Sequence, residues 1–315
     1  MKWSFSTAKI FSQCPKKWYY GAVFANPRSN DPERKEAYLL KHLQSVYAWR
    51  GKLVDQVITR FVVQKLNGHE KVDSDEVLAC ADRLMATQFA FAKAQLYRNS
   101  GVNDAKVSAS DYCALFELEY GGSLDEDSIK LVGEEVRDSL TNLLDSRLMS
   151  EIAEDGLHLI AQRTLQFQFA NVIVKSTPDL IAFFKNKPPA IIDWKVEAPK
   201  HKEHWLQLGV YAVSLSRVTP HKDFPLQWKS NLSDPTKIGL TEFQLLRNRE
   251  VQYFPTQEDV IDTEDYIYTT SSRMQHMINN SNKPELLINL LPTTKSPEIC
   301  VRCQFKKICW EEKRA

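Results

Sequence analysis

Residues 177–195 read TPDLIAFFKNKPPAIIDWK and contain two short apolar runs on either side of a Pro-rich turn. Such runs, rich in β-branched and aromatic residues, are typical of buried strands, and the turn predicts an antiparallel hairpin. Because side chains alternate between the faces of a strand, Asp193 and Lys195 are expected on one face. A turn centred near Lys187 would place Asp179 roughly opposite Lys195. The stretch therefore predicts two carboxylates and one ammonium group at a single place on a sheet.

Two interpretations fit this cluster of acids and lysine. Carboxylate oxygens suit Mg²⁺ or Mn²⁺, which can activate water and neutralise charge on a phosphodiester, while a lysine can stabilise the transition state. The alternative is an ordinary cross-strand salt bridge on a half-buried sheet. The residues of the hairpin alone leave both interpretations open.

The rest of the chain has the pattern of a mixed α/β protein. Apolar residues at helical spacing dominate the first half, where Ser74 is a candidate N-cap. Three strands joined by hairpins are predicted up to Val196, followed by a covering helix, one or two more strands and a last long helix. In chain order, the predicted segments are an N-terminal segment (1–30), a mainly helical region (31–158), a sheet-containing core (159–255) and a helix with a cysteine-rich tail (256–315).

The composition narrows the possible partners and the compartment. With 41 Lys plus Arg against 40 Asp plus Glu, the chain has no net field that attracts a polyanion. DNA binding would therefore depend on a local patch, or on a partner such as a helicase or another protein of the same operon. No apolar run approaches the length of a membrane span, and residues 1–20 lack the apolar segment of a signal peptide. We expect a cytoplasmic protein without a membrane partner, whose thiols stay reduced.

Three elements, in this order along the chain, resemble a known family. Asp179 after a proline, Asp193-x-Lys195 and the later Gln207-x-x-x-Tyr211 resemble the signature of the RecB-like branch of the PD-(D/E)XK nuclease superfamily. The resemblance implies a restriction-endonuclease-like mixed sheet flanked by helices, with Asp179 and Asp193 as Mg²⁺ or Mn²⁺ ligands and Lys195 as the catalytic lysine. It also implies that Gln207 and Tyr211 face DNA. Taken alone, they would be a partly buried amide and a packed phenol.

The cysteines carry a second resemblance. Cys300, Cys303 and Cys309 follow the spacing C-x2-C-x5-C, and Cys14 lies in an S-x7-C-P opening. This arrangement resembles RecB-like nucleases with one cysteine before the core and three after it, among them the CRISPR-associated RecB-like exonucleases and the AddB nuclease domain. The resemblance implies a [4Fe-4S] cluster that joins the two chain ends, and relatives that serve repair, recombination or antiviral defence. Four thiolates could instead hold tetrahedral Zn²⁺.

One position departs from the family pattern. RecB-like nucleases commonly carry Gly-x-x-x-His before the sheet, and here Gly51 is followed by Asp55 where the metal-binding histidine would stand. Asp55 is either a harder ligand that favours Mg²⁺ or a surface acid beside an impaired site. We therefore expect a metal-dependent DNA nuclease acting on single strands or DNA ends, as an exonuclease more than an endonuclease. The alternatives are a catalytically impaired DNA-binding or scaffold subunit of a repair, recombination or defence complex, and a zinc-stapled protein with an unrelated core.

Overall fold

The computed structural model of the protein describes residues 1–99, 111–122, 124–197, 201–230, 232–279, 288 and 290–311, with residues 201–204 and 311 described by their backbone alone.

Helices dominate the first half of the chain, as its apolar spacing predicts. They are α1 (Phe5–Gln13), α2 (Pro15–Tyr19), α3 (Pro32–Leu40), α4 (Val46–Val57), α5 (Val63–Asn67), α6 (Ser74–Lys93), α7 (Phe116–Glu119), α8 (Glu126–Leu144) and α9 (Arg147–Asp155). The prediction for α6 was wrong by one residue. Asp73 is the N-cap, because its side chain accepts from the N–H of Glu76, and Ser74 is the first helical residue.

The described strands form two mixed sheets. They are β1 (Lys2–Trp3), β2 (Gly156–Ala161), β3 (Leu165–Phe169), β4 (Val172–Ser176), β5 (Leu180–Phe184), β6 (Ala190–Lys195), β7 (Gly239–Gln244) and β8 (Arg249–Tyr253). The smaller sheet has the order β1-β4-β3, and the larger sheet has the order β2-β5-β6-β7-β8. Strands β6 and β7 are parallel and are joined through α10 (His201–Arg217) and α11 (Leu226–Lys229). The chain continues into α12 (Gln257–Asn279), α14 (Pro297–Val301) and α15 (Lys306–Glu311).

The strands between residues 165 and 195 differ from the three predicted. There are four, and they belong to two sheets: β3 and β4 form a hairpin in the smaller sheet, while β5 and β6 form a hairpin in the larger one. The segment between β4 and β5 contains Pro178, which has no N–H to donate to a ladder. The chain leaves one sheet there and enters the other.

The register of the β5–β6 hairpin also differs from the prediction. Leu180 pairs with Ile192, so the hairpin is centred on Asn186, and the same register carried one residue further brings Asp179 opposite Asp193. We predicted that Asp179 would lie opposite Lys195, which is wrong by two residues. Moving the centre of a turn by one residue shifts every pairing by two, and this shift brings the two acids together.

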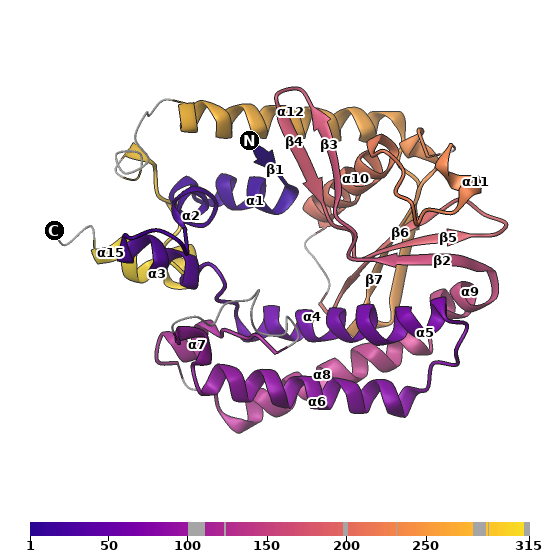
Figure 1. The fold of residues 1–315 in the computed structure, drawn as a ribbon, viewed down its shortest axis with the longest axis horizontal. Helices are drawn as coiled ribbons and strands as arrows, with labels where there is room; N and C mark the ends of the chain where they lie inside the picture. The colour runs from indigo at the N-terminus through magenta and orange to yellow at the C-terminus, as the bar shows by residue number, and fades with distance from the viewer. Residues whose placement is uncertain are drawn as a thin grey trace.

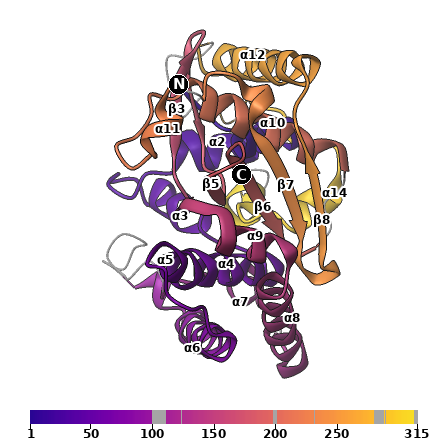
Figure 2. The ribbon, with the colours of Figure 1, turned by 90° about the vertical axis from the view of Figure 1, so that its right-hand side faces the viewer.

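Helices cover both faces of the larger sheet (Figure 1). On one face Ile191 packs in a cluster with Leu208 of α10, and on the other Trp194 joins the cluster that contains Leu53 of α4. Figure 2 shows the same arrangement from the side, with α10 and α12 on one side of the strands and α4, α6 and α8 on the other. The alternating side chains of β6 therefore point into two different packing environments.

Three long-range contacts fix the N-terminal residues and α10. The first strand, β1, pairs in parallel with β4, and the indole N–H of Trp3 donates to the hydroxyl of Thr270 on α12 at 3.0 Å. Helix α10 lies close against α12 because residue 209 is glycine: a Cβ there would lie 2.5 Å from the hydroxyl oxygen of Thr263. The N-terminal residues and α10 are thus held beside the strands.

Within the described residues, no helix combines the length and the apolar character needed to cross a membrane.

Candidate active site

Asp179, Asp193 and Lys195 meet at one end of the β5–β6 hairpin, as the sequence predicts. Asp193 lies on β6 and is 0% exposed, and its Oδ2 is 2.5 Å from the Nζ of Lys195. Asp179 directly precedes β5, and its Oδ2 accepts a hydrogen bond from the backbone N–H of Trp194 at 3.2 Å. A carboxylate from one strand is thereby fixed to the backbone of the next.

Asp55 comes to the same place from α4. The side-chain amide of Gln162 donates both to Oδ1 of Asp55 at 2.7 Å and to Oδ1 of Asp179 at 3.1 Å. The indole N–H of Trp194 donates to Oδ1 of Asp55 at 3.2 Å. The acids of α4, the start of β5 and β6 therefore lie close enough to feel one another's charge. Asp55 is not a remote surface acid.

Gln162 is a residue that the sequence analysis missed. It follows β2 with a backbone φ of 50°, in the left-handed region, and its N–H donates to the carbonyl of Asp179 at 3.0 Å. The left-handed region is uncommon for residues other than glycine. This backbone hydrogen bond holds the turn at Gln162, and the turn places the side-chain amide of Gln162 between the carboxylates of Asp55 and Asp179. No local sequence signal marks this glutamine.

Glu242 is a second missed residue. It lies on β7 in register with Asp193 of the parallel strand β6, so the two side chains share a face. Glu242 is 2% exposed, and its Oε1 accepts from the amide of Gln244 at 2.5 Å. A signal did exist, because a single acid in the apolar segment 238–246 is unusual for a buried strand.

Burial and mutual repulsion shift the titration of these groups. Burial, and then the charge of Asp193, raise the pKa of Asp179 well above its ordinary value. Burial also raises the pKa of Asp55, although the hydrogen bonds from Gln162 and Trp194 lower it in part. Burial alone would lower the pKa of Lys195, but the carboxylates, chiefly Asp193, outweigh it and the pKa lies above its usual range. The site gathers more negative charge than its lysine neutralises.

The raised pKa of Asp179 gives a pH-dependent prediction for the metal-free protein. The pKa of Asp179 is higher in the folded than in the unfolded chain, so its contribution to stability is full below the unfolded pKa and is lost as pH rises through the folded pKa. In EDTA, Asp179→Asn should therefore gain free energy of unfolding over wild type as pH rises, by at most about 1.4 kcal/mol per pH unit. Urea unfolding between about pH 5 and 9 measures this difference.

The control for that measurement is Asp234→Asn. A hydrogen bond from Thr236 lowers the pKa of Asp234, so its contribution to stability is already complete at pH 5 and above. Asp234→Asn should be destabilised by the same amount across that pH range. A constant difference for Asp179→Asn as well would show that Asp179 does not titrate with a raised pKa.

Gln207 and Tyr211 lie on α10 beside the acids. The amide of Gln207 donates to the Tyr211 hydroxyl at 2.6 Å, and Tyr211 is 7% exposed. Burial, and then the charges of Asp193 and Asp179, raise the pKa of Tyr211 far above its usual value. The phenol therefore stays protonated and lies within the field of the two carboxylates.

The four predicted cluster cysteines surround one small cavity of about 20 Å³, together with Tyr20, Phe305 and Trp310 among others. Cys14 is the N-cap of α2, where its sulfur accepts from the N–H of Lys17 at 3.4 Å. Burial raises the pKa of Cys303 to about 11, and Cys14 and Cys309 add to this shift. The two ends of the described chain therefore meet at these thiols, and Figure 1 shows α2 and α15 near one another.

As the side chains stand, no three His, Cys, Asp or Glu residues of the described chain have the mutual spacing of a metal site. At the carboxylates, positive or partly positive donors lie among the oxygens: the amide of Gln162 bridges Asp55 and Asp179, and the ammonium group of Lys195 contacts Asp193. The donor set is nevertheless the one that Mg²⁺ or Mn²⁺ prefers.

One protein-family model matches nearly the whole chain. A model of the PD-(D/E)XK nuclease superfamily matches residues 2–310. No curated protein matches the chain. Among solved structures, the crystal structure of SSO0001 is similar over 62% of this chain and 78% of its own, with 17% identity and a TM-score of 0.28.

Proposed function

Because the chain belongs to the PD-(D/E)XK nuclease superfamily, we propose that it is a RecB-like, metal-dependent nuclease that hydrolyses phosphodiester bonds of DNA, on single strands or at ends and as an exonuclease. The observation that carries this proposal is the convergence of Asp55, Asp179 and Asp193 beside Lys195. These residues come from three separate segments. A merely structural salt bridge would need only one of the acids.

Asp179 and Asp193, with Asp55, would hold Mg²⁺ or Mn²⁺. A bound divalent cation supplies the charge that activates water and neutralises the phosphodiester as its P–O bond breaks. Burial raises the pKa of Asp55 and Asp179, and the charge of Asp193 adds to both shifts. Gln162 holds two of the three acids in place, and the backbone N–H of Trp194 fixes the orientation of Asp179.

Lys195 supplies positive charge at the reacting phosphate. Its ammonium group stays protonated because the neighbouring acids raise its pKa. From its position against Asp193 it can donate a hydrogen bond to the attacking water or to a phosphate oxygen, whose charge grows in the transition state. Tyr211 is protonated and is oriented by Gln207, so its hydroxyl can donate a hydrogen bond to a neighbouring phosphate oxygen of the DNA strand.

The test of this function is cleavage of single-stranded and double-stranded DNA with Mg²⁺ or Mn²⁺, in wild type and in variants of Asp55. If Asp55 is a ligand, Asp55→Ala should lower kcat/KM by on the order of 10²-fold. Asp55→His restores the family residue, and we expect it to cleave with a shift in preference toward Mn²⁺. The control is Asp138→Asn, an exposed acid on α8, which should cleave like wild type.

Each contrary result has one meaning. Unchanged cleavage by Asp55→Ala would remove Asp55 from the site. A wild-type protein that binds DNA but cleaves none of these substrates with either metal would support the scaffold subunit instead.

For the cysteines, we propose a [4Fe-4S] cluster held by Cys14, Cys300, Cys303 and Cys309. All four line the same cavity although they lie at opposite ends of the sequence. Apart from the thiols, its lining combines apolar and aromatic side chains with Lys17, Lys306 and two threonines, and aromatic shielding with positive charge nearby suits an anionic cluster. Such a cluster would cross-link α2 to α14 and α15 and would stabilise the fold rather than take part in cleavage.

A further inference from the structure

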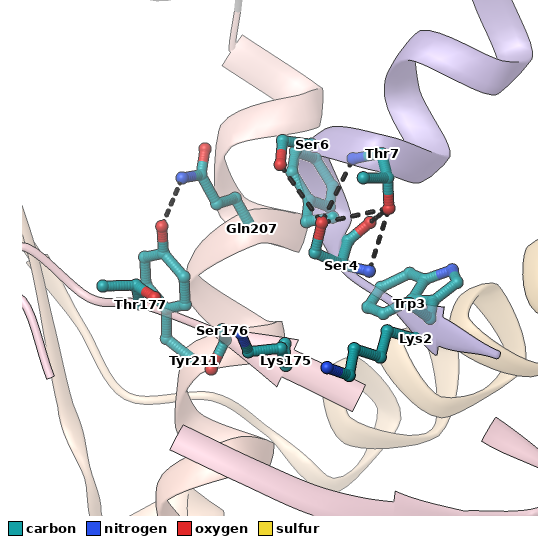
Figure 3. A pocket seen from close by; sticks show the side chains of 11 residues that line it. Lys2, Trp3, Ser4, Ser6, Thr7, Lys175, Ser176, Thr177, Gln207 and Tyr211 are labelled. Atoms are coloured by element: carbon teal, nitrogen blue, oxygen red, sulfur yellow. Dashed lines mark hydrogen bonds between the residues drawn. The ribbon is translucent and has the colours of Figure 1, made fainter. Parts of the chain in front are cut away.

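A cavity of about 370 Å³ opens between the N-terminal residues, the end of β4 and α10 (Figure 3). Figure 3 shows Gln207 and Tyr211 of α10 on one side and the first turn of α1 on the other. The cavity lies near the acids, because Tyr211 lines it and feels the charges of Asp193 and Asp179. A molecule in this cavity would lie next to the candidate active site.

The charge of the cavity favours an anion. Lys2 and Lys175 line it, and neither has an ion pair with another described residue, while none of its described lining residues is acidic. A flexible lysine without a carboxylate partner can neutralise a bound phosphate. The charge thus differs in sign from that of the acids beyond Tyr211.

The start of α1 adds hydrogen-bond donors. Ser4 caps the helix, since its hydroxyl accepts from the N–H of Thr7 at 3.3 Å, and the first turn contains no acidic residue. The N–H groups of Phe5 and Ser6 have no partner within a helix that begins at Phe5. Both residues line the cavity, where the helix dipole also favours negative charge.

A buried hydroxyl gives an independent indication of a ligand. Ser176, at the end of β4, lines the cavity and is 6% exposed, and its Oγ finds no hydrogen-bond partner among the described residues. A buried hydroxyl without a partner is costly in a folded protein. A rotation of this side chain toward the cavity would let a phosphate oxygen accept its proton.

We propose that this cavity binds a backbone phosphate of the DNA strand that is being cut, through Lys2, Lys175 and the start of α1. The identity of the ligand as DNA rests on the proposed function, while the anionic site itself rests on the cavity. Tyr211 lies between the cavity and the acids. A DNA strand with one phosphate in the cavity would therefore have its neighbouring phosphodiester beside the acids. The N-terminal residues thereby take part in substrate positioning.

The experiment measures binding of a fluorescein-labelled single-stranded oligothymidylate by anisotropy, in EDTA so that metal-dependent cleavage cannot occur. Lys2→Ala/Lys175→Ala should raise Kd about tenfold near 0.1 M salt. The slope of log K against log salt should fall by about 0.7 to 1.4, because each phosphate contact on a single strand contributes about 0.7. The control, Lys130→Ala/Lys237→Ala, removes two exposed lysines whose ion pairs lie elsewhere and should leave both quantities unchanged.

A third variant guards against loss of folding. An acid in the first turn of a helix is stabilising, so Ser6→Asp should fold at least as well as wild type, yet it should weaken binding by repelling the phosphate. Its control, Ser74→Asp, places the same acid in the first turn of α6.

The outcomes separate this proposal from the proposed function. Wild-type Kd and slope in both Ser6→Asp and the Lys2/Lys175 variant would overturn the phosphate site, even if cleavage with Mg²⁺ is intact. A failure of wild type to bind the strand at all would also overturn it. If binding weakens as expected but wild type never cuts DNA, the phosphate site stands and the nuclease proposal falls.

Discussion

Asp193→Asn is expected to lower the rate of DNA cleavage by on the order of 10³-fold, because it removes an acid that is fully buried and contacts Lys195. Asparagine has nearly the same shape, so the hairpin should remain intact. Lys195→Met, which keeps the apolar stem and removes the charge, should cause a loss of similar size. The measurement is single-turnover cleavage with saturating Mg²⁺ or Mn²⁺, with thermal unfolding recorded for each variant.

The control is again Asp138→Asn, which changes the same functional group at an exposed position of α8, outside the hairpin. Cleavage that survives in Asp193→Asn at the wild-type rate would exclude the proposed mechanism. A loss of activity accompanied by a large fall in Tm would instead report misfolding, and for this reason Lys195→Met is measured in parallel.

Cys14→Ser is the second change with a large expected effect. If the four cysteines hold one cluster, loss of Cys14 should release the same iron and acid-labile sulfide as Cys303→Ser, although the two residues lie at opposite ends of the chain. The visible absorbance of an anaerobically purified protein should disappear in both variants. Because the cluster would close a loop of nearly the whole chain, Tm should fall by about 10 °C.

Cys80→Ser provides the matched control. Cys80 lies on α6 and is not among the residues around the cysteine cavity, so its replacement should leave iron content and Tm unchanged. Wild type that contains zinc and no iron would exclude the iron–sulfur cluster. Full retention of iron in Cys14→Ser would exclude the connection between the two ends of the chain.

Local patterns were enough to predict part of the site. Alternation along β6 places Asp193 and Lys195 on one face whatever the rest of the chain does, and that prediction is confirmed. The helical spacing of α10 likewise brings Gln207 next to Tyr211. Both inferences depend only on the periodicity of one element.

The parts that were wrong or missed depend on contacts between distant elements. The position of Asp179 depends on where a hairpin turns, and the predicted centre was one residue away from Asn186. Gln162 reaches the site because its backbone after β2 is left-handed, and no neighbouring residue in the sequence predicts that conformation. The smaller sheet forms because β1 pairs with a strand about 170 residues later, and no local periodicity can predict such a pairing.

The pairing of β1 with β4 also has a consequence for biosynthesis. A ribosome makes the N-terminal end first, yet Trp3 requires Thr270 of α12, and the sulfur of Cys14 lies with those of residues 300–309. The residues around Trp3 and Cys14 must therefore remain without these partners until Thr270 and residues 300–309 have been synthesised. The phosphate-binding cavity, which contains these residues, is completed only after translation has passed its last partners. A nascent chain consequently has no finished cavity with which to engage DNA.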